Sequence, residues 1–155
     1  MNTVAITKRT GRDFLEKRSE LGKRFQAVSA PLDVLVVEDR ESDLRLILSS
    51  LRLVLGATCK LRSAASRGAM LDAVRQQAPS LIFLDDLLQS DRAEVTIPAL
   101  KAAGYDGAVI IISGLVTRTR LVELNRLGVV DVIHKDDLNS SRLKEAVLKS
   151  LPGAP

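Results

Sequence analysis

The sequence of 155 residues contains one cysteine, one histidine and no tryptophan, and aromatic residues make up only 3% of it. A single cysteine, Cys59, excludes a disulfide framework within the chain and a metal site built from several cysteines. No apolar run approaches the roughly 18 residues needed to span a membrane, and the polar, basic N-terminus lacks the apolar stretch of a signal peptide. We therefore expect a cytoplasmic protein.

Most of the chain also lacks net charge. The first 30 residues contain seven Lys and Arg against three Asp and Glu, whereas the remaining 125 residues contain 16 of each sign. A basic segment can favour nucleic acid or an anionic membrane. Only two aromatics, Phe14 and Phe25, lie in this segment, and both fit an apolar helix face. We therefore expect neither nucleic-acid binding nor membrane contact.

The basic segment has the pattern of an amphipathic helix over residues 12–29. Its apolar face consists of Phe14, Leu21, Phe25 and Val28. A hinge is predicted up to Pro31, which divides the chain into an extension (1–31) and a globular domain (32–155). Because an isolated helix of about 18 residues is marginal in water, we expect this face to be covered, by a second copy in a homodimer or by a partner protein.

From Asp33 onward, short apolar runs alternate with longer helical patterns. The predicted strands are 33–38, 58–63, 80–85, 108–113 and 129–134, and the predicted helices are 43–56, 68–78, 94–104, 117–128 and 140–151. The first, third and fourth strands are continuous apolar runs, typical of a parallel sheet that is covered on both faces. The second contains alternating Lys60 and Arg62, which predicts a more exposed edge strand. This order predicts an open, doubly wound α/β fold with five parallel strands.

Polar groups follow four of these strands, at the edge where open α/β folds place their sites. They are Glu38 and Asp39, Asp85 and Asp86, Ser113 and Gly114, and His134 and Lys135. Carboxylate oxygens around a small cleft suit Mg²⁺. A carboxylate beside the metal can attack phosphorus and form an acyl phosphate, whose charge a metal, a lysine and a hydroxyl can stabilise. The sequence therefore predicts phosphoryl chemistry at this edge.

The same motifs, read in order, resemble the receiver domain of two-component response regulators. They are "VLVVEDRESD" with Glu38 and Asp39, "SLIFLDDLL" with Asp85, "VIIISG" with Ser113, and "VVDVIHKDDL" with Lys135. The resemblance implies a flavodoxin-like fold in which Asp85 is the phosphoacceptor and Ser113 and Lys135 complete the site. It also implies that Glu38, Asp39, Asp85 and the backbone carbonyl of Leu87 hold Mg²⁺. Strand alternation should turn the adjacent Asp86 the other way.

Three positions depart from the family pattern. Gln89 stands where the family usually has a proline, and Val132 and Ile133 stand where it usually has an aromatic residue. Asp136 replaces the usual cis proline after the lysine. Because a cis bond without proline costs roughly 3 kcal/mol, we expect a trans bond and an altered loop there. These changes should affect signal output more than phosphoryl chemistry.

The resemblance implies a single-domain response regulator that accepts a phosphoryl group from a histidine kinase or a phosphotransfer protein. Since no DNA-binding or catalytic domain follows in this sequence, we expect output through protein–protein contact. We expect no enzyme activity beyond self-phosphorylation from a phosphodonor and self-dephosphorylation. One alternative is a pseudo-receiver, a binding module that phosphate does not switch. A more remote alternative is a Mg²⁺-dependent enzyme of the Toprim type. Such a site requires a D-x-D pattern, which "LDDLL" lacks.

Overall fold

A computed structural model describes residues 32–152 of the chain. The predicted N-terminal helix, its hinge and the proposed homodimer contact fall in residues 1–31, outside the described residues. No helix in the described part is both long enough and apolar enough to cross a membrane.

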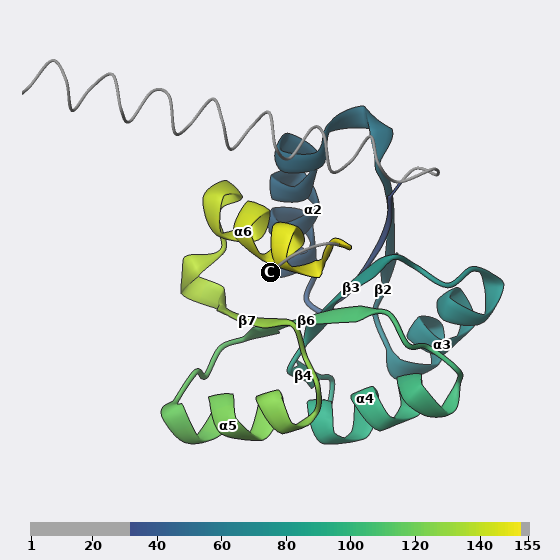
Figure 1. The fold of residues 1–155 in the computed structure, drawn as a ribbon, viewed down its shortest axis with the longest axis vertical. Helices are drawn as coiled ribbons and strands as arrows, with labels where there is room; N and C mark the ends of the chain where they lie inside the picture. Colours follow the sequence, from purple (N-terminus) through teal and green to yellow (C-terminus); the bar gives the residue numbers. More distant parts are fainter. Residues whose placement is uncertain (1–31, 153–155) are drawn as a thin grey trace, which may run out of the picture. The chain divides into compact units, whose positions relative to one another are not determined.

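A parallel sheet of five strands forms the centre of the domain (Figure 1). Its strands are β1 (Asp33–Val37), β2 (Lys60–Ala64), β3 (Leu81–Asp85), β6 (Ala108–Ser113) and β7 (Asp131–His134). They lie in the order β2-β1-β3-β6-β7. Every residue of β1 and β3 is buried, as expected for apolar strands covered on both faces, whereas most of the edge strand β2 is at least partly exposed. The predicted doubly wound fold and the predicted edge strand are both confirmed.

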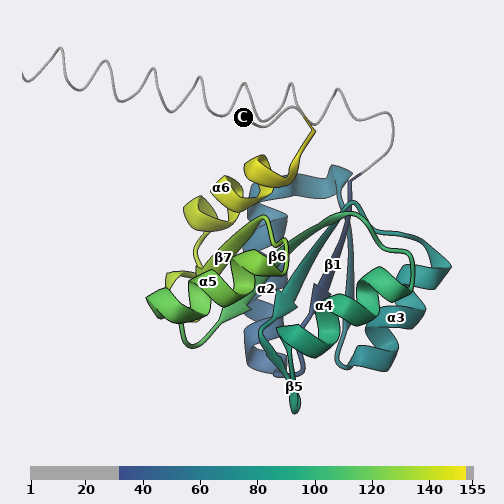
Figure 2. The same cartoon turned by 60° about the horizontal axis from the view of Figure 1, so that its bottom comes forward.

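Helices cover both faces of this sheet. They are α2 (Glu41–Leu55), α3 (Arg67–Gln76), α4 (Ala93–Ala102), α5 (Arg118–Arg126) and α6 (Ser140–Ser150). Figures 1 and 2 show α2 and α6 on one face and the other three helices on the opposite face. Side chains cap three of the helix starts, where Ser66, Thr117 and Asn139 each accept a hydrogen bond from a backbone amide of the first turn. The predicted helices are confirmed, with ends that differ by at most two residues.

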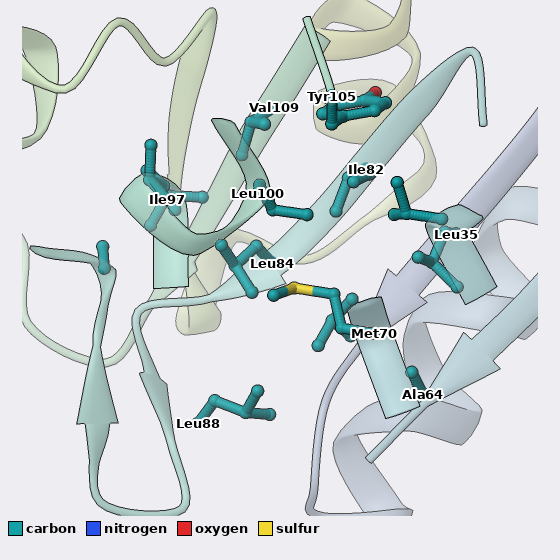
Figure 3. Close-up of a cluster of buried hydrophobic side chains, with 14 of the residues drawn as sticks. Leu35, Ala64, Met70, Ile82, Leu84, Leu88, Ile97, Leu100, Tyr105 and Val109 are labelled. Carbon is teal, nitrogen blue, oxygen red and sulfur yellow. The ribbon is translucent and has the colours of Figure 1, made fainter. Parts of the chain in front are cut away.

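A cluster of buried apolar side chains lies between the sheet and the three helices α3, α4 and α5 (Figure 3). Alternate strand residues such as Leu35, Ile82 and Leu84 meet Met70 from α3 and Leu100 from α4. Each large apolar side chain that is fully buried contributes roughly 1.5–3 kcal/mol. This packing fixes the strands, and with them the polar residues that follow the strands.

A short antiparallel hairpin, which the sequence did not predict, follows β3. Its strands are β4 (Leu87–Leu88) and β5 (Asp91–Arg92). Leu88 is buried in the apolar cluster, which anchors the hairpin, and Gln89 at its turn has a φ of 56°. A proline ring fixes φ near about −65°. The backbone at this turn therefore excludes the proline that stands here in the receiver family.

The segment after β7 also follows the predicted departure. Within residues 32–152 there is no cis peptide bond, so the bond between Lys135 and Asp136 is trans, as predicted. A short 3₁₀ helix, η2 (Lys135–Asp137), begins there. The ring nitrogen Nδ1 of His134 accepts a hydrogen bond from the Asp136 amide at 3.0 Å. The single histidine thus caps η2, while Lys135 is the first residue of this turn. A second 3₁₀ turn, η1 (Gly56–Thr58), follows α2.

A buried ion pair ties the edge strand β2 to β1. The Arg62 guanidinium binds both carboxylate oxygens of Asp33, at 2.9 and 3.0 Å, and also donates to two backbone carbonyls, of Ala73 and Gln77. Asp33 is only 4% exposed. Removal of the cation would therefore leave a buried carboxylate without its counter-ion.

We expect Arg62→Ala to lower the free energy of unfolding by about 3 kcal/mol, because it breaks a buried pair from one side. The matched control is Arg45→Ala, which breaks an exposed pair with Glu41 and should cost no more than about 0.5 kcal/mol. Urea denaturation of both variants measures the difference. Equal effects of the two substitutions would contradict the role given to Arg62.

Candidate functional site

The sheet register brings the predicted site residues to one edge. Asp85 ends β3 and lies opposite Ile112 of β6, and Ser113 of β6 lies opposite His134 of β7. Glu38 directly follows β1, and Lys135 directly follows β7. Carboxyl ends of neighbouring parallel strands meet at the same edge, so residues distant in sequence become neighbours here.

Lys135 links three carboxylates at this edge. Its Nζ lies 3.0 Å from Asp43, 3.4 Å from Asp85 and 3.6 Å from Glu38. Burial alone would lower the pKa of Lys135, but the hydrogen bond that it donates to Asp43 and the charges of Asp85 and Glu38 raise that pKa. The ammonium group is therefore held in its charged form. Sequence reasoning missed the part of Asp43 and treated it only as an early residue of helix α2.

Glu38 is the most deeply buried acid of the site, with 1% of its surface exposed. Its Oε1 accepts a hydrogen bond from the Arg40 amide at 2.9 Å. Its Oε2 is buried and, among the described residues, has no hydrogen-bond partner. Burial raises the pKa of Glu38 to about 7, against the opposing effect of the Arg40 amide and with a further contribution from the charge of Asp85. The ionised form of Glu38 needs a nearby cation, and Lys135 Nζ lies 3.6 Å from Oε2.

The acids fit a divalent metal ion. Ligand atoms of Glu38, Asp39 and Asp85 all lie within 4.8 Å of one another. Asp39 is exposed and the other two are buried. Hard divalent cations prefer oxygen ligands, and Glu38 Oε2, which accepts no hydrogen bond from the described residues, is available to bind such an ion. Leu87 follows Asp85 by two residues, and its amide donates to Asp85 Oδ1 at 3.2 Å.

A pocket of about 290 Å³ opens beside Asp85. It is lined by Arg40, Asp85, Asp86, Leu87, Arg92, Ser113, Gly114, Leu115, Arg120 and Lys135. The side chains of Leu87 and Leu115 are 51% and 59% exposed, so both stand at its open side. The structure thus brings Ser113 and Lys135 to the same pocket as Asp85.

Arg120 of α5 is the main residue that sequence reasoning missed. Its side chain is 6% exposed, and its guanidinium binds both oxygens of Asp86, with the contact from Nε at 2.9 Å. It also binds Glu94 of α4 and Glu123 of α5. The hydrogen bonds that Arg120 donates to Asp86 and Glu94 raise its pKa above the ordinary value. The one feature of the sequence that could have indicated Arg120 is Asp86, a second acid directly after Asp85 that needs a cation of its own.

Among the described residues, the Ser113 hydroxyl forms hydrogen bonds with Asp86 and Leu115 and none with Asp85. Its hydroxyl oxygen lies 3.1 Å from Asp86 Oδ2 and 2.9 Å from the carbonyl oxygen of Leu115. It also accepts a hydrogen bond from the Leu115 amide at 3.1 Å. The two adjacent acids therefore have separate partners: Lys135 for Asp85, and Arg120 with Ser113 for Asp86.

Solved structures with a fold similar to that of the described domain include receiver domains. No family model matches the chain, and no curated protein sequence matches it. Among solved structures, NtrX from Brucella abortus is 27% identical over 79% of this chain and 27% of its own, with a TM-score of 0.69. The signal receiver domain of a Luxo repressor protein from Vibrio parahaemolyticus is 24% identical over 76% of this chain and 87% of its own, with a TM-score of 0.67.

A third similar structure is the BeF3-activated N-terminal receiver domain of Klebsiella pneumoniae RstA. It is 17% identical over 76% of this chain and 97% of its own, with a TM-score of 0.65. These comparisons show that the described domain has the receiver-domain fold of response regulators.

Proposed function

We propose that this chain is the receiver of a response regulator and accepts a phosphoryl group on Asp85 with the help of Mg²⁺. The observation that carries the proposal is the grouping of three carboxylates with one ammonium. Ligand atoms of Glu38, Asp39 and Asp85 lie within 4.8 Å of one another, and Lys135 Nζ lies 3.4 Å from the candidate acceptor Asp85. The receiver-like fold supports the same function.

In the proposed reaction a carboxylate oxygen of Asp85 attacks the phosphorus of a phosphohistidine in a histidine kinase or a phosphotransfer protein. The new O–P bond replaces the P–N bond, and the freed imidazole nitrogen keeps the electron pair and takes up a proton. Glu38, Asp39, Asp85 and the Leu87 carbonyl would hold Mg²⁺, which supplies charge stabilisation for the transferred group. Lys135 is placed to pair with an oxygen of the phosphoryl group once Asp85 carries it as an acyl phosphate.

Two arginines at the pocket are available to meet an anionic phosphodonor. Arg40 and Arg92 both line it, and within residues 32–152 no hydrogen bond or ion pair engages either guanidinium. Arg120, by contrast, is already saturated by three carboxylates. Free cations at the mouth favour the approach of a negatively charged donor to a site that itself contains several acids.

The test is whether the chain forms a beryllium trifluoride adduct, which mimics an aspartyl phosphate. Fluorine NMR of the wild-type protein should show bound fluoride signals when Mg²⁺ is present and none when it is chelated. A folded protein that binds no BeF3⁻ in excess Mg²⁺ would overturn the proposal and favour a pseudo-receiver. The Toprim alternative also predicts no adduct at Asp85.

We also expect the phosphorylated form to last long. Leu87 and Leu115 stand at the open side of the pocket, and neither side chain can orient an attacking water molecule, whereas both exclude one. The double substitution Leu87→Asn with Leu115→Glu should therefore speed hydrolysis about tenfold or more, as expected for polar groups that position the reactant. Decay of the acyl phosphate after removal of the donor measures this rate.

An exposed leucine elsewhere provides the control. Leu53→Asn changes a side chain on α2 that is 81% exposed and does not line the pocket, so it should leave the decay rate unchanged. If the double variant decays no faster than Leu53→Asn, the steric explanation of the long lifetime is wrong.

A further inference from the structure

The Ser113 hydroxyl has one proton, and that proton is already used in a hydrogen bond. It can donate that proton to Asp86 Oδ2 at 3.1 Å or to the Leu115 carbonyl at 2.9 Å. Its oxygen accepts from the Leu115 amide. Because Ser113 is 2% exposed, water is a poor substitute for these partners. For Ser113 to donate to a phosphoryl oxygen on Asp85, it must first leave Asp86.

Asp86 is a strong competitor for this proton. It is ion-paired with Arg120, and a hydrogen bond to an ionised carboxylate is about twice as strong as one between neutral groups. Asp86 also keeps its two contacts with Arg120 after the hydroxyl leaves, so the exchange does not strand a buried charge. The hydrogen bond to Asp86 therefore opposes the move of the Ser113 hydroxyl to a phosphoryl oxygen, but no unpaired buried charge prevents that move.

Arg120 connects this hydrogen bond to two helices. The same guanidinium holds Glu94 in the first turn of α4 and Glu123 in α5. When the Ser113 hydroxyl no longer donates a hydrogen bond to Asp86, the Asp86 oxygens become better acceptors for Arg120. The stronger contact with Asp86 then draws the guanidinium away from Glu94 and Glu123. This connection does not use an aromatic residue in β7, where Val132 and Ile133 stand.

We propose that Asp86 is a positioning residue that holds the Ser113 hydroxyl away from the phosphoryl site in the resting state, and that Arg120 transmits its release to helices α4 and α5. The inference rests on the proposed phosphoryl chemistry at Asp85 and adds the regulation of that site.

The test is a double-mutant cycle on BeF3⁻ affinity in saturating Mg²⁺, with wild type, Asp86→Asn, Ser113→Ala and the double variant. Asp86→Asn replaces a charged acceptor by a neutral amide and should tighten BeF3⁻ binding about tenfold, since charged acceptors bind a hydroxyl more strongly by about that factor. In the Ser113→Ala background the same substitution should change the affinity less than threefold. Titration calorimetry gives the four dissociation constants.

Glu94→Gln is the matched control. It removes the same charge from the same arginine, but Glu94 makes no contact with Ser113 among the described residues. Its affinity for BeF3⁻ should stay within about twofold of wild type. If Asp86→Asn binds no tighter than wild type, or gains equally with and without Ser113, then Asp86 acts at most through its charge and the inference is overturned.

A measurement on the wild-type protein tests the second half of the inference and stands even if a variant fails to fold. The Nε–H proton of Arg120, which donates to Asp86, should shift in the NMR spectrum when the BeF3⁻ adduct forms. A resonance that stays in place while the adduct forms overturns the connection to the helices. A wild-type chain that forms no adduct overturns this inference together with the proposed function, whereas an adduct without coupling overturns this inference alone.

Discussion

Asp85→Asn is expected to abolish acid-labile labelling of this chain by acetyl phosphate, to less than about one hundredth of the wild-type level. The amide nitrogen and oxygen of asparagine are poor nucleophiles toward phosphorus, so the substitution removes the attacking group itself. Asp85 lies 3.4 Å from Lys135 Nζ, and its ligand atom lies within 4.8 Å of those of Glu38 and Asp39. Radiolabelled donor and denaturing gels measure the bound phosphoryl group.

The adjacent acid provides a closely matched control. Asp86→Asn makes the same chemical change one residue away, but Asp86 faces Arg120 and Ser113. We expect this variant to keep its labelling. Circular dichroism should confirm that both variants are folded. If Asp85→Asn is labelled at the wild-type level, Asp85 is not the phosphoacceptor, whatever the result for Asp86→Asn.

Mg²⁺ binding should depend on pH through Glu38. Burial raises the pKa of this carboxyl to about 7, and a metal ligand must be deprotonated to bind. Between pH 8 and pH 6, we therefore expect the affinity for Mg²⁺ to fall by roughly tenfold. Calorimetric titrations with Mg²⁺ across this range measure the effect. Glu38→Gln should bind Mg²⁺ more weakly at every pH and lose this dependence.

The same group should make the metal-free protein less stable as the pH rises. The folded state keeps the Glu38 proton up to about pH 7, whereas the unfolded chain releases it near 4.5. The free energy of unfolding should therefore fall between these two values, by on the order of 3 kcal/mol. Glu38→Gln should flatten this part of the curve. Asp39→Asn, which changes an exposed ligand, should weaken Mg²⁺ binding but keep the slope, and a slope unchanged in Glu38→Gln would contradict the account.

The sequence predicted the sheet well because its three central strands are almost entirely buried. The apolar runs that became β1, β3 and β6 admit few other readings, since a strand covered on both faces needs apolar side chains throughout. The order of the strand ends then placed Glu38, Asp85, Ser113 and Lys135 at one edge, where the structure has them. Helix ends were less certain, because terminal turns are defined by caps such as Ser66.

What the sequence could not predict depends on contacts between distant residues. The hairpin of β4 and β5 has strands of two residues each, too short for any periodic pattern. Arg120 lies 34 residues beyond Asp86 on a helix whose pattern is that of an ordinary amphipathic surface helix. Asp43 likewise resembles a first-turn acid until Lys135 arrives from the other end of the sheet. Only the folded chain shows that two separate ion-pair systems flank Asp85.

The most direct test of the account is to map the phosphorylated residue. Reduction of an aspartyl phosphate with borohydride converts that residue to homoserine, which peptide mass spectrometry can place. Wild-type protein treated with acetyl phosphate and Mg²⁺ should yield homoserine at position 85 and aspartate at position 86. Homoserine at position 86, or no modified residue in protein that has bound the label, would contradict the central claim.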